Sequence, residues 1–317
     1  MFQKTITSRP SFPSSSLGTH CSGSSGFLFP ILVLLLLFSP PAFAGDKIGI
    51  DLEWRPITGL GPSAPAKKRE TGGGAPRTST AESGAPGKTW TDPVTGMEFV
   101  WASGGCYQMG CGSWADKCYG NEKPIHEVCL DGFWMGKYEV TQGQWEKVMA
   151  GNPSNFKNGS NYPVEQVSWN DCGQFIDRLN GKSGGQYKFR LPTEAEWEYA
   201  CRSGGKPEKY AGGGDVDRVA WYNKNSGGRT HEVGTKSPNG LGIYDMSGNV
   251  WEWCDDWYAK YQAGSQKNPT GPAGGSARVV RGGSWNSDAR RVRCGLRNSR
   301  GPDGRNDLLG FRLVRTR

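Results

Sequence analysis

The sequence predicts an α+β domain in which irregular segments dominate over helices and strands. The 317 residues include 48 glycines, and turn-forming pairs recur along the chain, which argues against a helical bundle and against a parallel α/β sheet. Short strand-like runs are separated by long loops, and only three segments carry helix-start signals. A hydrophobic content of 35% with 11% aromatic residues is enough to form a core.

Each predicted helix begins at a serine or threonine that can cap its N-terminus, and apolar residues then recur at helical spacing. Gly181 is expected to end the second helix. The predicted helices are 142–149 capped by Thr141, 169–180 capped by Ser168, and 194–201 capped by Thr193. The strand-like runs that follow are 243–246, 278–281 and 310–314.

Residues 1–44 have the features of a secretory signal peptide. Their charged residues are basic, no acidic residue precedes Asp46, and an apolar run over 27–38 leads to the small-x-small sequence Ala42-Phe43-Ala44. We therefore expect a secreted or periplasmic protein, with an N-terminal membrane anchor as the alternative. The apolar run is shorter than a bilayer requires, so no stable membrane span is expected after cleavage.

Three further segments follow the signal peptide. Residues 45–60 form a short N-terminal segment with the alternation of a single strand. Residues 61–88 contain no Ile, Leu, Val, Met or aromatic residue and are rich in Gly, Pro and Ser, so they predict a disordered linker. The folded domain is expected over 89–317.

Positive charge gathers at the C-terminal end of the chain. Residues 276–317 contain eleven arginines, no lysine and three aspartates, which gives this tail a formal charge of +8. Arginine favours planar, bidentate contacts to carboxylate or phosphate. The tail is therefore either a ligand-binding surface or a network that ties the chain end to acidic groups of its own domain. No nucleic-acid partner is expected, because stacking aromatics are not interleaved with these arginines.

The cysteine content indicates disulfides. Removal of the signal peptide leaves eight of the nine cysteines, and an even number is typical of a disulfide-bonded exported protein. No CxxC pair occurs and few histidines are present, so zinc is not expected. These cysteines are Cys106, Cys111, Cys118, Cys129, Cys172, Cys201, Cys254 and Cys294.

Six phrases in a fixed order resemble the formylglycine-generating enzyme family, also called the sulfatase-modifying factor domain. The resemblance covers roughly Thr89 to Arg317 and implies one C-type-lectin-like domain with low regular secondary structure, stabilised by disulfides and calcium. The phrases are FWMGKYEVTQGQW (133–145), YPVEQVSWNDC (162–172), YKFRLPTEAEWEYACR (187–202), NGLGIYDMSGNVWEWCDDWY (239–258), RVVRGGSW (278–285) and LGFRLV (309–314).

The resemblance also defines where this chain departs from the family's enzymes. Those enzymes oxidise a sulfatase cysteine to formylglycine with a copper ion held by two cysteines in the pattern GGS-aromatic-x-Cys-x4-Cys. In this chain the two positions are Ser287 and Val292, and Leu308 replaces an asparagine of the enzymes. Copper(I) prefers thiolate ligands, so copper is not expected as a cofactor. Whether the chain is an enzyme is left open at this stage.

The family's calcium loop maps onto the SGNVWEW phrase. Glu252 is expected to be the side-chain ligand, with backbone carbonyls near Ser247, Asn249 and Val250 completing the oxygen shell of a structural calcium. The alternative is that Glu252 accepts hydrogen bonds from backbone amides while the adjacent tryptophans pack in the core.

The family resemblance implies a disulfide between Cys201 and Cys294. Proximity along the chain suggests Cys106 with Cys129 and Cys111 with Cys118, which leaves Cys172 with Cys254.

The expected function is that of an exported, non-oxidase recognition or accessory module. The ligand would be a protein, a peptide or an envelope polymer. The alternatives are a formylglycine-generating oxidase and a retroelement-diversified binding protein, whose variable segment resembles residues 282–314. The residues of the expected ligand pocket are Trp253, Ser284, Trp285, Asn286, Ser287, Arg291 and Asp307.

Overall fold

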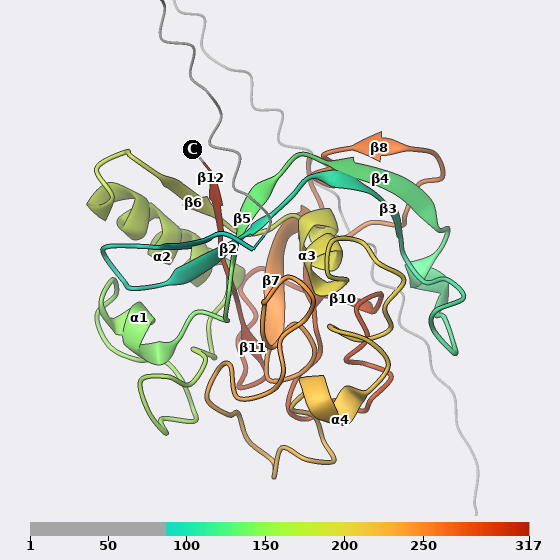
Figure 1. Cartoon of the computed structure of the whole chain (residues 1–317). Helices are drawn as coiled ribbons and strands as arrows, with labels where there is room; N and C mark the ends of the chain where they lie inside the picture. Colours follow the sequence, from blue (N-terminus) through green and yellow to red (C-terminus); the bar gives the residue numbers. More distant parts are fainter. Residues whose placement is uncertain (1–86, 317) are drawn as a thin grey trace, which may run out of the picture. The chain divides into compact units, whose positions relative to one another are not determined.

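The computed structural model describes residues 87–316. The expected signal peptide, the 45–60 segment and all but the end of the 61–88 linker lie outside the described residues. The described part combines short helices with three β-sheets and long irregular connections, which confirms the α+β prediction (Figure 1). None of the helices between residues 87 and 316 has the length and apolar character that crossing a bilayer requires.

A five-stranded sheet separates two hydrophobic clusters. On β2 and β5, alternate residues face opposite sides, so Phe99 and Trp134 join one cluster while Val100 and Met135 join the other. The C-terminal strand lies inside this sheet, paired with β5 and β6. The strand order is β1 (Thr89–Thr91), β2 (Glu98–Ala102), β5 (Phe133–Gly136), β12 (Val314–Thr316) and β6 (Lys188–Arg190).

Two smaller sheets complete the strand content of residues 87–316. The four-stranded sheet centres on β7, which pairs antiparallel with β9 and parallel with β11. Its order is β10 (Arg297–Arg300), β9 (Arg278–Arg281), β7 (Trp251–Trp257) and β11 (Leu309–Gly310). The three-stranded sheet has the order β3 (Gly105–Met109), β4 (His126–Leu130) and β8 (Gln266–Lys267).

The three predicted helices are confirmed, each with the capping box that its sequence indicates. They are α1 (Gln142–Glu146), α2 (Trp169–Lys182) and α3 (Glu194–Cys201). Helix α1 is shorter than predicted, and Gly181 lies inside α2, which runs one residue further. The one-turn helices η1 (Gly120–Glu122) and α4 (Val216–Val219) were not predicted.

Two of the three strand predictions need correction. Residues 243–246 form a loop, because Asn239 Oδ1 accepts a hydrogen bond from the Ile243 amide and Asp245 adopts a left-handed φ of 57°. The run over 310–314 is split between β11 and β12. Between these strands the Phe311 and Leu313 carbonyls accept from the Val140 and Gly136 amides, so the chain crosses from one sheet to another. The 278–281 prediction is confirmed as β9.

Three of the four expected disulfides are present: Cys201–Cys294, Cys106–Cys129 and Cys111–Cys118. The Cys172–Cys254 prediction is wrong, because both residues are buried free thiols. Cys172, on α2, packs with Trp253 in the hydrophobic cluster that contains Phe99 and Trp134. Cys254 follows Trp253 on β7, so its side chain faces the opposite side of the sheet. It packs in the other hydrophobic cluster, which contains Val100 and Met135.

We expect a thiol-alkylating reagent to modify Cys172 and Cys254 only after the protein unfolds, because both thiols are buried. The disulfide-linked peptides should contain Cys106–Cys129, Cys111–Cys118 and Cys201–Cys294. Mass spectrometry of the non-reduced, alkylated protein provides the measurement. A peptide that links Cys172 to Cys254 would contradict this assignment.

Candidate functional site

The GGSW turn closes on itself through its two serines. The Ser284 amide donates to Ser287 Oγ at 3.0 Å, and the Ser287 amide donates to the Ser284 carbonyl at 2.9 Å. Both serines are buried. Gly283 has a φ of 74°, and a Cβ at this position would lie 2.7 Å from the Arg291 carbonyl oxygen, so the turn requires glycine. The Ser287 hydroxyl is therefore a structural acceptor.

The Val292 side chain also has a structural role, because it packs in the core. It lies in a small buried cluster with Tyr210, Val219, Ala220 and Tyr222. Ser287 supplies a hydroxyl and Val292 only hydrocarbon at the two positions that the family resemblance assigns to the copper ligands of the enzymes. Among residues 87–316 the cysteines outside disulfides are Cys172 and Cys254, which belong to the core clusters. These donors do not fit copper(I), which requires thiolates.

The expected pocket residues are divided between the core and the surface. Trp253 is fully buried, and its Nε1 donates to the Val167 carbonyl at 3.0 Å. Trp285 is half-buried, and its Nε1 donates to the Asp307 carbonyl at 3.0 Å. Asn286 and Arg291 are exposed, whereas Ser284 and Ser287 are not.

Arg291 borders a cavity of about 260 Å³ that includes side chains the sequence did not indicate. Tyr119 and Asn121 follow the Cys111–Cys118 disulfide and reach this place from a distant part of the sequence. Trp251 lines the cavity from the same face of β7 as Trp253. The cavity is lined by Tyr119, Asn121, Trp251, Arg291, Leu296, Arg297 and Asn298.

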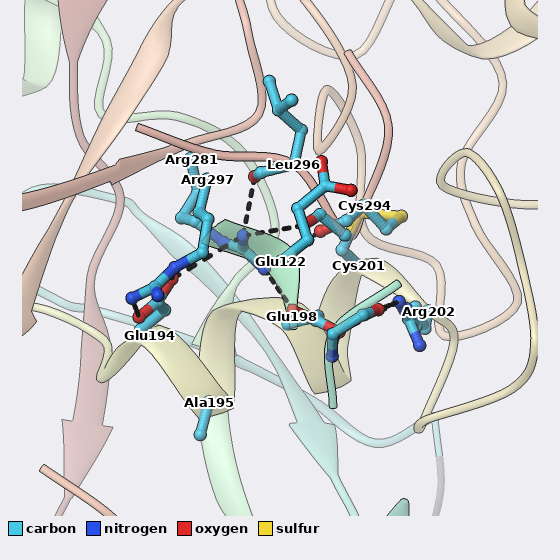
Figure 2. Close-up of polar contacts among 12 residues, drawn as sticks. Glu122, Glu194, Ala195, Glu198, Cys201, Arg202, Arg281, Cys294, Leu296 and Arg297 are labelled. Carbon is cyan, nitrogen blue, oxygen red and sulfur yellow. Dashed lines mark hydrogen bonds and ion pairs between the residues drawn. A yellow bond between two sulfur atoms is a disulfide. The ribbon is translucent and has the colours of Figure 1, made fainter. Parts of the chain in front are cut away.

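Most of the buried arginines of the tail form ion pairs with glutamates inside the domain (Figure 2). Arg281 contacts Glu198, and it also donates to the Leu296 carbonyl at 2.6 Å. Arg297 makes two hydrogen bonds to Glu194, at 2.8 and 2.6 Å. The buried tail arginines are Arg281, Arg293, Arg297, Arg312 and Arg315. The network alternative is confirmed for Arg281, Arg293, Arg297 and Arg312, which pair with Glu198, Glu122, Glu194 and Glu252 respectively.

The 288–291 turn keeps its positive charge accessible. Arg291 has 63% of its side chain exposed, and Arg290 is similarly exposed. Both lie 3.7 to 3.8 Å from Asp288 oxygens, which is too far for a strong hydrogen bond. The Arg290 and Arg291 amides donate to Asp288, so the backbone of the turn is fixed while the guanidinium groups face solvent.

The expected calcium ligands already have protein partners. Glu252 accepts from Arg312 at 2.6 and 2.7 Å and from Trp197 Nε1 at 2.7 Å. The Asn249 side chain bonds Glu139, and the Ser247 hydroxyl accepts from the Ala211 amide. Both carboxylate oxygens of Glu252 are therefore engaged by protein donors in this arrangement. Calcium binding stays a prediction that metal analysis of the purified protein can test.

The carboxyl groups of Glu139 and Asp245 lie near Glu252, and the positive charge of Arg312 acts on all three. Burial, followed by the charge of Asp245, raises the pKa of Glu139 well above its usual value. Burial also raises the pKa of Asp245 to about 6, while Arg312 opposes this shift. The Glu139 carboxyl accepts from the Val250 amide at 3.0 Å and so fixes the SGNVWEW loop against the start of α1.

Residues 86–317 match the family of the sulfatase-modifying factor enzyme 1-like domain. This chain belongs to that family. The matched range contains the six ordered phrases and the Cys201–Cys294 disulfide that the resemblance implied.

The similarities extend to proteins with different names. The chain is 32% identical to "Chaperone protein LppX" of Paenibacillus barcinonensis, over 69% of this chain and 90% of that protein. It is 39% identical to a formylglycine-generating enzyme of Streptomyces coelicolor, over 49% of this chain and 52% of the enzyme. The solved structure of Treponema denticola variable protein 1 superposes with a TM-score of 0.64 at 32% identity, covering 72% of this chain and 98% of that one.

We expect Arg281→Gln to lower the free energy of unfolding by about 2–4 kcal/mol, because the buried Glu198 carboxylate then keeps only Arg202 of its two arginine partners and the Leu296 carbonyl loses its donor. Urea denaturation followed by tryptophan fluorescence measures the change. Arg290→Gln is the matched control, and it should cost less than about 0.5 kcal/mol since Arg290 is exposed. Equal effects of the two substitutions would contradict the structural role of Arg281.

Proposed function

We propose that this chain is an exported, non-oxidase recognition module of its family that binds an anionic ligand beside Arg291. The proposal rests on the residue types at positions 287–292. Where the enzymes have two metal-binding thiols, this chain has a buried hydroxyl, a buried valine and two exposed arginines between them. Export is part of the proposal, supported by the signal-like sequence and the three disulfides.

The chemistry of this surface favours carboxylate or phosphate. Arginine presents a planar fork of donors that matches either group. Arg290 and Arg291 are weakly paired with a single aspartate, so an incoming anion replaces one loose contact with two stronger ones. Tyr119 and Trp251 provide apolar surface in the adjoining cavity. The ligand is therefore an acidic protein segment, peptide or envelope polymer.

The similarity to a protein named a chaperone supports an accessory role, since that relative is covered over 90% of its length. The similarity to formylglycine-generating enzymes supports the oxidase alternative. The absence of thiols at positions 287 and 292 weighs against that alternative.

A direct assay separates the oxidase from the recognition module. The purified protein is incubated with copper(I), oxygen and a sulfatase-motif peptide, and the aldehyde product is measured by mass spectrometry. We expect no aldehyde above the protein-free background. Turnover by the wild-type chain would overturn the non-oxidase proposal.

Salt-sensitive binding tests the arginine surface. We expect purified peptidoglycan sacculi to retain the protein at about 50 mM NaCl and to release it at several hundred millimolar, because exposed charges are screened. Arg290→Gln combined with Arg291→Gln should reduce retention at least several-fold. The matched control removes two exposed positive charges from α2, Arg178→Gln with Lys182→Gln, and should retain binding. Equal retention of all three proteins would remove this turn from the binding surface.

The retroelement alternative has its own support in the pattern of burial. Exposed residues of the C-terminal segment, among them Asn286, Arg291 and Asn298, lie between buried residues that hold the fold. The similarity to a solved structure named a variable protein also favours this alternative. An adenine-rich template copy of residues 282–314 beside a reverse-transcriptase gene would establish it. Flanking DNA without either feature removes it.

A further inference from the structure

A second cavity, of about 400 Å³, lies between the start of α3, the end of β7 and the 258–277 loop that joins β7 to β9. This loop forms a fixed wall. Its strand β8 pairs with β4, and Asn268 both donates to the Cys129 carbonyl and accepts from the Asp131 amide at 2.9 Å. In Figure 1, β8 lies along the outer side of β4. The cavity is therefore built by regular elements on two sides and by a hydrogen-bonded loop on the third.

The interior is largely apolar but contains two buried polar side chains with unused acceptor atoms. Asp256 is 6% exposed, and its Oδ2 accepts from the Glu194 amide at 2.9 Å. No described residue donates to its other oxygen. His126 is 5% exposed, and its Nδ1 lies 3.1 Å from the Pro124 carbonyl. Since a carbonyl only accepts, Nδ1 is the donor of this hydrogen bond, and Nε2 has no hydrogen-bond partner among the described residues.

Both side chains line the same cavity, so a ligand that brings a hydrogen-bond donor finds an unpaired carboxylate oxygen on Asp256. Apolar contacts come from Met109, Ala195, Trp257, Pro269 and Pro272. Most ligand sites combine a mainly apolar wall with a few fixed polar groups, and this cavity has that composition.

The charges around Asp256 favour a cation. Arg297 also lines the cavity, but its guanidinium is held by Glu194 at 2.6 Å, and Arg281 lies 3.6 Å from the same carboxylate. The nearby charged groups that act on Asp256 itself are the acidic Glu194, Asp255 and Glu196. Burial, followed by the charge of Glu194, raises the pKa of Asp256 to about 7.

The remaining titratable groups at this cavity do not supply the missing cation. Lys260 belongs to the lining but is exposed to solvent, and Tyr261 donates to Glu194 Oε1 at 3.2 Å. The His126 ring packs against the Tyr261 ring, with 4.8 Å between the centroids.

A metal ion does not suit the spacing of these groups. Within residues 87–316, the acidic, histidine and cysteine side chains close enough to share one ion are Cys111, Cys118 and Glu122, and the two cysteines form a disulfide. Asp256 and His126 belong to no such group of three, so this cavity does not offer the set of side chains that usually holds a metal ion. We propose that this cavity binds a small organic amine, with its ammonium group on Asp256 and its apolar body against Trp257 and Met109.

Benzylamine, benzyl alcohol and benzoate test the proposal with one ring and three head groups. We expect benzylamine to bind the full-length protein at least tenfold more tightly than benzyl alcohol at pH 8, and benzoate to bind more weakly still. Calorimetry or NMR titration measures the affinities. Equal affinities of the three probes, or no saturable binding of benzylamine, would overturn the proposal without any variant.

Asp256→Asn assigns the charge to its residue. The amide oxygen still accepts from the Glu194 amide, so the start of α3 keeps its cap, while the negative charge is lost. We expect at least a tenfold loss of benzylamine affinity and little change for benzyl alcohol. Asp177→Asn, on the exposed face of α2, is the matched control and should behave as the wild type. Unchanged benzylamine binding by a folded Asp256→Asn protein would exclude Asp256 as the anchor.

The pH dependence has a defined sign. The Asp256 carboxyl must be ionised to hold an ammonium group, and its pKa is about 7, so benzylamine affinity should rise between pH 6 and pH 8. Benzyl alcohol affinity should stay level over the same range. A benzylamine affinity that is independent of pH would contradict the role of Asp256.

Nα-acetyl-lysine methylamide presents the same ammonium group as part of a peptide. Tighter binding of this probe than of benzylamine assigns the natural ligand to a protein side chain, and weaker binding assigns it to a free amine. In either case the bound group is an ammonium held by Asp256.

Discussion

The buried contact between Arg281 and Glu198 organises the C-terminal half of the domain. Arg281 also donates to the carbonyls of Cys294, Gly295 and Leu296, in a segment where no regular ladder satisfies them. A buried charge is tolerated when it is paired and hydrogen-bonded, and here the two terminal nitrogens of one guanidinium serve a carboxylate and three carbonyls. The irregular chain after the GGSW turn therefore has a fixed course without secondary structure of its own. The Cys201–Cys294 disulfide attaches the same segment to the end of α3.

This constraint explains how one arginine-rich tail serves two purposes. Arg293 and Arg297 point inward to Glu122 and Glu194, and both pairs are almost completely buried. Arg290 and Arg291 lie only a few residues earlier on a turn that the network does not cover. Because the inward arginines hold the backbone, the outward ones can be exchanged with little effect on stability. A surface of this kind is suited to recognition, since its side chains can change while the scaffold persists.

The sequence was sufficient for the starts of the three main helices and for part of the covalent framework. Capping boxes at Thr141, Ser168 and Thr193 located the helices, because those signals act within four residues. The Cys172–Cys254 prediction failed because pairing by elimination ignores which side of a strand each residue faces. Cys254 faces away from Cys172 on β7, and nothing near either cysteine in the sequence encodes the placement of α2 against that strand.

The candidate site shows the same division between local and long-range information. The sequence singled out residues 284–291, but it could not indicate that Tyr119 and Asn121 border Arg291, since more than 150 residues separate them. Burial also could not be inferred for Ser284 and Ser287. Hydroxyls are common on surfaces, and only the closed turn makes these two internal.

The surroundings of position 292 are unsuited to a copper(I) ligand. The Val292 side chain packs among two tyrosines, a valine and an alanine, so a thiol at this position would be surrounded by ring and methyl carbons. Burial in such surroundings raises a thiol pKa and keeps the group protonated, which opposes copper(I) binding. The hydrocarbon at this position instead adds to the core beneath the 288–291 turn. The same residue that removes a metal ligand thus supports the backbone on which Arg290 and Arg291 are displayed.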